Sequence, residues 1–382
     1  MNLRNKIREY YRSYFNPNDL LELIKTQPFQ QREFAYQTFT TNDKGKMNWK
    51  RNFLFQNIDD FCQYITQHAP RKLYFGAVYS DLDQKQSVQN ATIIESNLKF
   101  DIDIDHSFQI RRFVCDCNEK EEEYAKANIK KKEICEECFK FSLEAAAFLI
   151  STLRTDFGIS EAPWIYFSGS RGLHVHYPNT PFLDPLENIW NETKIRQPFM
   201  YYLNMIKREK DRNTGKYRES ILHPPVSQNM VLRILNMVLL PFYLETPLED
   251  LIQMKWYSVS KKGTKKQLSP AVASNALTGL KQRLSEKNYD YNGLFVYGRN
   301  LSHQMLKKHD FYTTKIAHEC LLNNGILSRY PRYDASPTTN MEKLIKVPNS
   351  IDGSTGLLVQ RIPFQSLLSF TMEDLKTIDD FV

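Results

Sequence analysis

Segments able to cross a membrane are missing from this sequence. No apolar run approaches the roughly 20 residues that a spanning helix needs. The N-terminus opens an amphipathic helical pattern and has no signal-peptide core. Cysteine is also scarce, and six in 382 residues argue against a disulfide framework. We find no internal repeat and no low-complexity tract. These absences predict an intracellular protein with no membrane partner.

The composition that remains is globular. Hydrophobic residues make up 41% and charged residues 25%, so a chain of 382 residues can bury a sizeable core. The net charge of +7 is a mild indication of a polyanionic partner. Aromatic residues reach 13%, which suits both core packing and base stacking.

Segment 100–105 alternates between apolar and acidic residues, as a half-buried strand does. Asp101 and Asp103 would then share one face, about 7 Å apart. Carboxylates this close repel each other, and Mg²⁺ or Mn²⁺ is the common remedy because hard cations prefer carboxylate oxygens. The alternative is a strand with a solvated acidic face. The flanking features favour a metal site.

Four cysteines form two pairs, Cys115 with Cys117 and Cys135 with Cys138, separated by 17 residues. Paired thiolates at such spacing are typical of tetrahedral zinc sites, and His106 is a possible substitute ligand. The pattern has no evident open position, so we expect a structural site. The alternative is a redox pair or incidental buried cysteines.

Two polar, glycine-containing turns are candidate phosphate sites. In segment 166–174 a strand enters, two glycines permit a tight turn and a strand leaves. Backbone amides there can cradle phosphate oxygens, while Arg171 adds a forked donor and His174 a further donor when protonated. In segment 343–356, Lys346 alternates with apolar neighbours and points away from the core. Each segment alone could be a simple hairpin.

Periodicity predicts an α/β (α+β) organisation. We expect helices over 2–27, 58–68 and 139–157, strands over 32–36, 49–55, 72–80, 100–105, 164–167, 173–177, 344–347 and 357–362, and a closing acidic helix. Helical patterns dominate 182–325, where segment 206–287 carries 15 Lys and Arg against 7 Asp and Glu. We read 182–325 as a mostly helical basic insertion, which could track nucleic acid or simply be a solvated surface. The rest, 1–181 and 326–382, would be one domain with a zinc module at 106–140.

Several short motifs occur in a fixed order along the chain. They are R-E-F at 32–34, F-G-A-V-Y-S at 75–80, F-D-I-D at 100–103, the cysteine cluster, D-F-G at 156–158, S-G-S-R-G-L-H at 168–174, L-I-K-V-P-N-S at 344–350 and T-G at 355–356. Together they resemble the catalytic small subunit of archaeal and eukaryotic replicative DNA primase, with an archaeal character in the last motif. Segment 182–325 carries almost none of the resemblance.

The resemblance implies a set of metal-binding carboxylates. Asp101 and Asp103 match the two strand aspartates that hold the catalytic Mg²⁺ or Mn²⁺. Asp334 matches a third aspartate that precedes the L-I-K segment, and Glu342 is the second choice for that position.

The resemblance also implies a nucleotide site. Ser168, Arg171 and His174 would contact the triphosphate, Lys346 matches a basic residue that touches the same phosphates, and Arg32 matches one near the nucleotide pocket. The sequence departs from the family pattern at two positions. Asp352 stands where family members often have His, which removes one phosphate donor, and Tyr74 replaces an acidic residue that some eukaryotic members place near the sugar.

By this resemblance the protein would be the catalytic subunit of a DNA primase. It would make short primers from nucleoside triphosphates on single-stranded DNA during replication, by two-metal nucleotidyl transfer, with structural Zn²⁺ and a large regulatory subunit. The expected fold is a primase-type catalytic domain with a mixed sheet, in the cytoplasm if archaeal and the nucleus if eukaryotic. The alternatives are a repair-type primase-polymerase that extends DNA ends and a non-catalytic zinc-containing nucleic-acid binding module.

Overall fold

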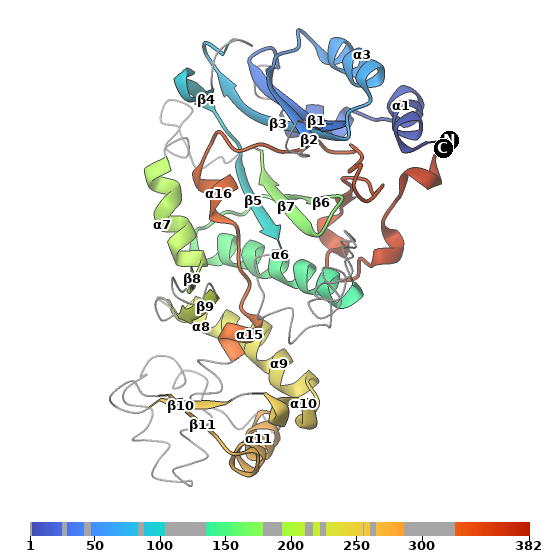
Figure 1. The fold of residues 1–382 in the computed structure, drawn as a ribbon. Helices are drawn as coiled ribbons and strands as arrows, with labels where there is room; N and C mark the ends of the chain where they lie inside the picture. Colours follow the sequence, from blue (N-terminus) through green and yellow to red (C-terminus); the bar gives the residue numbers. More distant parts are fainter. Residues whose placement is uncertain are drawn as a thin grey trace. The chain divides into compact units, whose positions relative to one another are not determined.

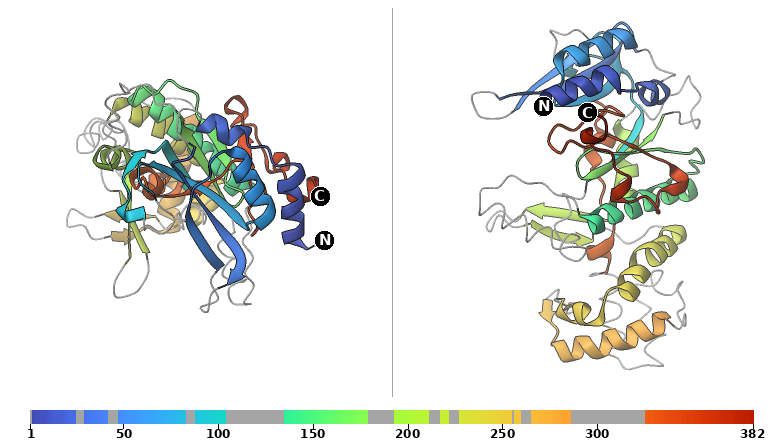
Figure 2. Two further views of the ribbon diagram at one scale, coloured as in Figure 1. Left: turned by 90° about the horizontal axis from the view of Figure 1, so that it is seen from above. Right: turned by 90° about the vertical axis from the view of Figure 1, so that its right-hand side faces the viewer.

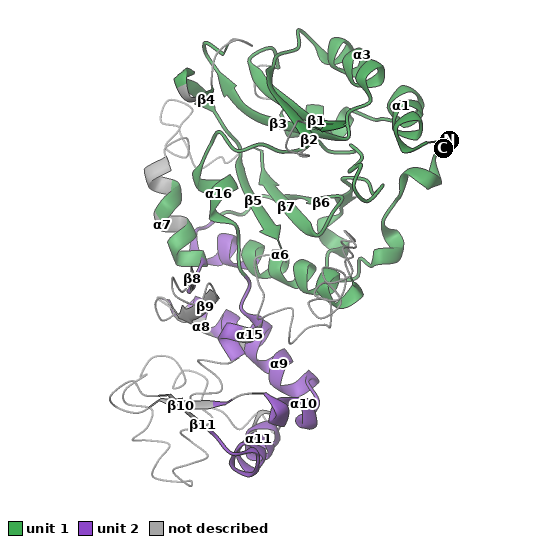
Figure 3. Ribbon diagram, viewed as in Figure 1, with its two compact units in different colours: residues 1–150, 159–203, 332–382 green, residues 151–158, 204–331 purple. Residues whose placement is uncertain are grey.

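The computed structural model of the chain describes residues 2–24, 29–41, 47–82, 88–103, 135–178, 193–210, 217–221, 227–254, 256–259, 265–285 and 325–382. The chain divides into two compact units, which Figure 3 colours separately. Unit 1 comprises Met1–Ile150, Ile159–Leu203 and Arg332–Val382, and unit 2 comprises Ser151–Gly158 and Asn204–Pro331. The expected domain division at 181/182 and 325/326 stays a prediction.

Unit 1 contains two sheets, and the first is built mostly from the N-terminal part of the chain. Its elements are α1 (Leu3–Ser13), α2 (Asn18–Leu23), β1 (Arg32–Thr41), β2 (Met47–Phe53), α3 (Ile58–His68), β3 (Lys72–Tyr79), η1 (Val88–Asn90), β4 (Ile93–Glu95) and β12 (Ile345–Lys346). The strand order is β12-β3-β1-β2, with β4 also paired to β3. Helices α1 and α3 pack against each other beside this sheet (Figure 1).

The second sheet lies below the first in the view of Figure 1. Its elements are β5 (Leu98–Asp103), α6 (Glu136–Asp156), β6 (Trp164–Phe167), β7 (Gly172–Tyr177), α7 (Thr193–Leu203), α16 (Ala335–Thr339) and β13 (Arg361–Ile362). The strand order is β13-β6-β7-β5. Every strand pair within the described residues is antiparallel, so the expected mixed sheet was wrong. A tight turn, such as the one between β6 and β7, can join only antiparallel neighbours.

The alternation predicted for β5 is present. Phe100 and Ile102 are buried on one face, while Asp101 and Asp103 are half-buried on the other. Helix α6 runs across the sheet in Figures 1 and 2. Its Phe139 packs edge-on against Phe167 of β6, with ring centroids 5.7 Å apart. The apolar face of the second sheet is therefore covered by a helix, and its acidic face is left for the first sheet to approach.

The last sixty residues of the chain bind both sheets. Strands β12 and β13 pair with β3 and β6, and each is shorter than the segment predicted from the sequence. The expected closing helix is wrong. In its place are the short 3₁₀ helices η6 (Phe364–Ser366), η7 (Met372–Asp374) and η8 (Ile378–Asp380). Thr371 with Asp374, and Thr377 with Asp380, form capping boxes, so the acidic side chains satisfy backbone amides of single turns. The two chain ends lie side by side (Figure 2), where Lys6 pairs with Asp379.

Unit 2 is helical with two antiparallel hairpins. Its elements are β8 (Ile206–Lys210), β9 (Tyr217–Ile221), α8 (Gln228–Ile234), the π-helix η4 (Leu235–Leu239), α9 (Leu240–Glu245), α10 (Leu248–Gln253), β10 (Tyr257–Val259), β11 (Lys265–Gln267), α11 (Pro270–Ser285) and α15 (Ile326–Arg329). Strands β8–β9 and β10–β11 are the hairpins, which the helical pattern alone did not predict. Across the described ranges of the chain, no helix is both long and apolar enough to cross a membrane.

Candidate active site

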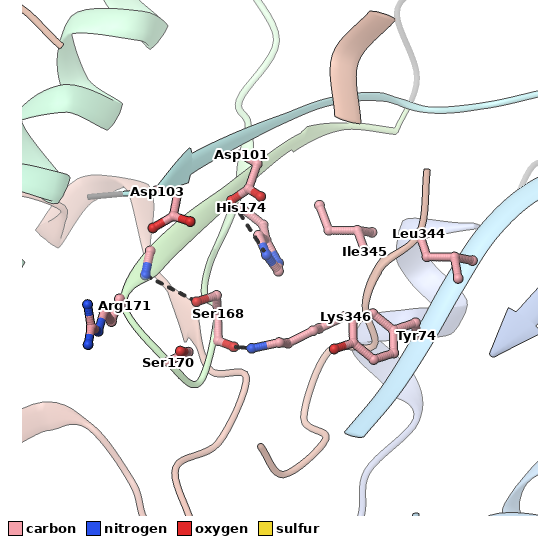
Figure 4. Close-up of a pocket in the computed structure, with 11 residues that line it drawn as sticks. Tyr74, Asp101, Asp103, Ser168, Ser170, Arg171, His174, Leu344, Ile345 and Lys346 are labelled. Atoms are coloured by element: carbon pink, nitrogen blue, oxygen red, sulfur yellow. Dashed lines mark hydrogen bonds and ion pairs between the residues drawn. The ribbon is translucent and has the colours of Figure 1, made fainter. Parts of the chain in front are cut away.

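A polar cavity of about 220 Å³ lies in unit 1 (Figure 4). It combines acidic side chains from β5 with basic and polar side chains from the turn after β6, from β7 and from the segment around β12. The lining residues are Tyr74, Asp101, Asp103, Ser168, Ser170, Arg171, Gly172, His174, Leu344, Ile345 and Lys346. Six residues that were predicted to form the site line this cavity, although they are up to 245 positions apart in sequence. They are Asp101, Asp103, Ser168, Arg171, His174 and Lys346.

Strand pairing fixes the acidic side of the cavity. Asp101 lies opposite His174 and Asp103 opposite Gly172 in the antiparallel β5–β7 pair. A Cβ atom on Gly172 would come within 2.3 Å of the carbonyl oxygen of Ile102, so only glycine fits there. The glycine of the turn thus lets the backbone of β7 approach the end of β5 that carries both aspartates.

Asp334 reaches the same place from a distant part of the chain. Its backbone N–H donates to the carbonyl oxygen of Asp101 at 3.0 Å, in an isolated antiparallel bridge. Its side chain caps α16 by accepting the Ser336 N–H at 2.9 Å. Neither Asp334 nor Glu342, the second choice for the third carboxylate, is among the cavity-lining residues. The charge of Asp334 acts on Asp101, whereas the Glu342 carbonyl oxygen accepts a bond from Arg51 at 3.0 Å. The structure therefore brings Asp334, and not Glu342, beside the strand aspartates.

The three carboxylates act on each other electrostatically. Burial, then the charges of Asp103 and Asp334, raise the pKa of Asp101 to about 7, while Lys346 acts in the opposite direction. The Asp101 side chain remains 27% exposed. Among the described residues, no three or more His, Cys, Asp or Glu side chains already lie close enough to enclose an ion. A cation would relieve the repulsion that raises this pKa, so the donor set suits a hard divalent ion if the carboxylates close on it.

His174 borders the carboxylates. Its Nε2 lies 3.9 Å from Oδ1 of Asp101. Burial, followed by the charges of His176, Lys346 and Lys99, lowers the pKa of His174 well below its usual value. The lowered pKa favours the neutral ring, whereas the role expected from the sequence was that of a donor when protonated. A neutral imidazole still donates one N–H to a ligand.

The turn that joins β6 to β7 carries Ser168 and Arg171. The Ser168 Oγ accepts the Gly172 N–H at 3.2 Å, and the Ser168 N–H donates to the Gly172 carbonyl at 2.9 Å, which closes the turn. Gly169 has φ +70°, a left-handed conformation that glycine adopts without strain. Arg171 lines the cavity with only 6% of its surface exposed. Its forked guanidinium is well suited to phosphate or carboxylate oxygens.

Lys346 extends from β12 toward the same turn. Its Nζ donates to the carbonyl oxygen of Ser168 and to Oδ2 of Asp352, both at 2.6 Å. The second bond was not foreseen, because no pattern in the sequence pairs Asp352 with a lysine. The only hint is that Asp352 occupies a polar turn six residues after Lys346.

Tyr74 and Arg32, which the resemblance places near the nucleotide site, lie in different surroundings. Tyr74 lines the cavity, pairs in register with Lys346 and packs edge-on against Trp49, with ring centroids 4.6 Å apart. Arg32 is not a lining residue. It is 1% exposed, its Nη1 donates to the carbonyl of Gly76 at 2.5 Å, and burial lowers its pKa to about 9.

The zinc prediction falls partly outside the described residues. Cys115, Cys117 and His106 lie outside them. Cys135 precedes α6 and Cys138 is in its first turn, where the Cys138 N–H donates to Sγ of Cys135 at 3.4 Å. Of the four cysteines only Cys135 and Cys138 lie within the described residues, so zinc binding stays a prediction.

Comparison with known proteins decides the family. The DNA primase small subunit family matches residues 100–362, more than half of the chain and nearly all of the cavity. The chain belongs to the DNA primase small subunit family. The resemblance noticed in the sequence is thereby confirmed, and the α+β architecture described above is consistent with it.

Three archaeal members of this family are similar to the chain. The DNA primase small subunit PriS of Saccharolobus solfataricus is 32% identical over 191 residues, 47% of this chain and 55% of that protein. PriS of Archaeoglobus fulgidus is 26% identical over 362 residues, 94% of this chain and 79% of that protein. PriS of Sulfolobus acidocaldarius is 31% identical over 172 residues, 44% of this chain and 50% of that protein. The first and third alignments thus span about half of each relative, and the archaeal character expected from the last motif is confirmed.

Proposed function

We propose that this chain is the catalytic subunit of a DNA primase, which makes short primers on single-stranded DNA from nucleoside triphosphates. One observation supports this most strongly. The carboxylates of Asp101 and Asp103 line a single cavity together with Arg171, His174 and Lys346. Nucleotidyl transfer needs both groups, because the attacking hydroxyl must be activated and charge on the triphosphate must be neutralised.

The acidic side is proposed to hold Mg²⁺ or Mn²⁺. Asp101 and Asp103 would bind it from β5, and Asp334, which bridges to Asp101, would be the third ligand. When bound, such ions lower the pKa of a hydroxyl and neutralise phosphate charge. The raised pKa of Asp101 supports the assignment, since a group of carboxylates that repel one another is stabilised by a cation.

The basic side is proposed to hold the triphosphate. Arg171 would bind phosphate oxygens through its fork, Lys346 through an ammonium N–H, and His174 as a neutral donor. Ser168 would contribute by position, because its hydroxyl closes the turn and its carbonyl oxygen fixes Lys346. Arg32 is buried at the start of β1 and donates to the Gly76 carbonyl of the neighbouring β3, so its contribution would be to hold the strand that carries Tyr74 and not to touch phosphate.

Further parts of the proposal rest on family membership and composition. Cys115, Cys117, Cys135 and Cys138 would bind a structural Zn²⁺, with His106 as a possible substitute. A large regulatory subunit would be the protein partner. The excess positive charge of segment 206–287 would bind the backbone of the template by releasing counterions.

Primer synthesis by an Asp103→Ala variant tests the proposal. Unprimed single-stranded DNA, labelled nucleotides and Mg²⁺ or Mn²⁺ are supplied, and the length of the products is measured. We expect wild-type protein to make primers and Asp103→Ala to make none while it still folds, because Asp103 is half-buried at a strand end. Asp59→Ala, which removes an exposed carboxylate from the first turn of α3, is the matched control and should keep wild-type yield.

Three results would overturn the proposal. Near-normal primer yield from Asp103→Ala would remove the role of the carboxylates. Incorporation only onto a primer already present would indicate the repair-type primase-polymerase, and no metal-dependent incorporation at all would indicate a binding module.

A further inference from the structure

A buried carboxylate lies between two lysines at the edge of the cavity. Asp352 is 0% exposed, and its Oδ2 accepts Nζ of Lys346 at 2.6 Å and Nζ of Lys72 at 2.9 Å. Because both nitrogens contact one oxygen atom, they can be no more than 5.5 Å apart (2.6 Å plus 2.9 Å). Two ammonium groups at this separation repel each other strongly unless an anion lies between them.

The strand register explains how these three residues meet. Lys346 of β12 pairs with Tyr74 of β3, and Lys72 is two residues before Tyr74 on the same strand face. Both lysines therefore approach the cavity from one face of the first sheet. Asp352 is in the turn that follows β12, and its other oxygen, Oδ1, accepts the Ser354 N–H at 2.8 Å. The carboxylate is thus held by the backbone and cannot rotate away from the lysines.

The charges in this cluster are matched to its burial. Burial alone would raise the pKa of Asp352, but Lys346 and Lys72 outweigh it and the pKa lies below its ordinary value. For Lys72, burial and then the charge of Lys346 lower the pKa, and Asp352 opposes both. An ionised Asp352 therefore neutralises part of the repulsion between the two lysines.

The geometry leaves one ammonium hydrogen of Lys346 for a ligand. An ammonium group has three N–H donors. Within the described part of the chain, one is donated to Asp352 and one to the Ser168 carbonyl. Since Lys346 lines the cavity, the third can reach an anion bound there.

We propose that Asp352 is a positioning residue, which holds Lys72 and Lys346 together so that Lys346 directs one N–H at an anionic ligand of the cavity. Naming that ligand as the phosphate of a nucleoside triphosphate rests on the proposed function. The cluster itself rests on the contacts above. The Asp352 carboxylate makes no contact with phosphate itself and acts through Lys72 and Lys346.

Substitution of Asp352 by Asn separates charge from shape. The amide keeps an oxygen for the Ser354 N–H, but it removes the anion and turns N–H donors toward two ammonium groups. Lys346 should then leave its position and the folded state should lose stability. Removing the second ammonium with Lys72→Met ends the repulsion, so the double variant Asp352→Asn/Lys72→Met should regain both stability and ligand binding. This recovery would be a coupling between sites in contact.

The experiment is a double-mutant cycle on the full chain. ATP binding with Mg²⁺ is measured by calorimetry and thermal unfolding is measured without ligand, for wild type, Asp352→Asn, Lys72→Met and the double variant. We expect Asp352→Asn to bind ATP about tenfold more weakly and to unfold at a lower temperature. The double variant should bind within about threefold of Lys72→Met. In primer synthesis, KM for nucleotide should rise with the loss of affinity, and kcat should change less.

Four outcomes test the positioning role of Asp352. Asp352→Asn that binds ATP as wild type does, or a double variant as impaired as Asp352→Asn in both assays, would overturn the positioning role. If wild type binds no ATP, the proposed function fails, yet recovery of the unfolding temperature in the double variant would still support the three-residue cluster. An Asp352→Asn protein that does not fold, with no recovery in the double variant, would also overturn the inference.

Discussion

Removal of the Asp101 charge should stabilise the metal-free protein at neutral pH. In the folded state the pKa of Asp101 is raised to about 7. In an unfolded chain it is about 3.9. The folded protein therefore binds the proton more tightly, so this group favours folding below pH 4 and loses that contribution as pH rises to 7.

The size of this effect follows from the shift. Three pKa units correspond to about 4 kcal/mol as an upper bound. Because 27% of the Asp101 side chain is exposed, solvent screening reduces this to about 2 kcal/mol. An Asp101→Asn variant has no charge to repel Asp103 and Asp334. We therefore expect it to be about 2 kcal/mol more stable than wild type at pH 7.5, and this difference should shrink steadily as the pH falls to 4.5.

Urea unfolding in the presence of EDTA, from pH 4.5 to pH 7.5, measures this difference. Added Mg²⁺ or Mn²⁺ should stabilise wild type more at pH 7.5 than at pH 4.5, because a proton and a cation compete for the same carboxylate, and it should stabilise Asp101→Asn much less. An Asp101→Asn variant that is less stable than wild type at pH 7.5, or a difference that does not change with pH, would refute the reasoning.

Two further predictions concern the zinc ligands and the phosphate contacts. Wild-type protein should contain one Zn²⁺ per chain by elemental analysis, and Cys135→Ser should lose it and unfold at a lower temperature. The control Cys62→Ser, which changes a half-buried cysteine of α3, should keep the zinc. A full zinc content in Cys135→Ser would count against the site. Arg171→Lys should raise KM for nucleotide by about tenfold or more, because an ammonium cannot reproduce the fork, while stabilisation by Mg²⁺ without nucleotide stays unchanged. Equal KM values would mean that Arg171 does not bind phosphate.

The sequence predicted features that depend on residues close together in the chain better than features that depend on residues far apart. The helical pattern over 58–68 predicted α3 with its observed bounds, and the alternation in 100–105 predicted which residues of β5 face the cavity. These features depend on neighbours a few positions apart. The closing helix was wrong because Thr371 and Thr377 start single capped turns, a choice made by side-chain hydrogen bonds that helical periodicity does not reveal.

The site shows the same division. Ser168, Arg171, His174 and Lys346 were found through family motifs, and the cavity does bring them beside the aspartates. The link from Asp352 to Lys72 was not foreseen, since the two residues are 280 positions apart and meet only through the pairing of β12 with β3. The lowered pKa of His174 was not foreseen either, because burial among other cations depends on the packed structure and not on the motif.

A crystal structure with Mn²⁺ and a non-hydrolysable nucleoside triphosphate tests the central claim most directly, because the anomalous signal of manganese locates the ions. The account predicts manganese bound by Asp101, Asp103 and Asp334, with the triphosphate against Arg171 and Lys346. Manganese away from these carboxylates, or a triphosphate bound outside the cavity, would contradict it.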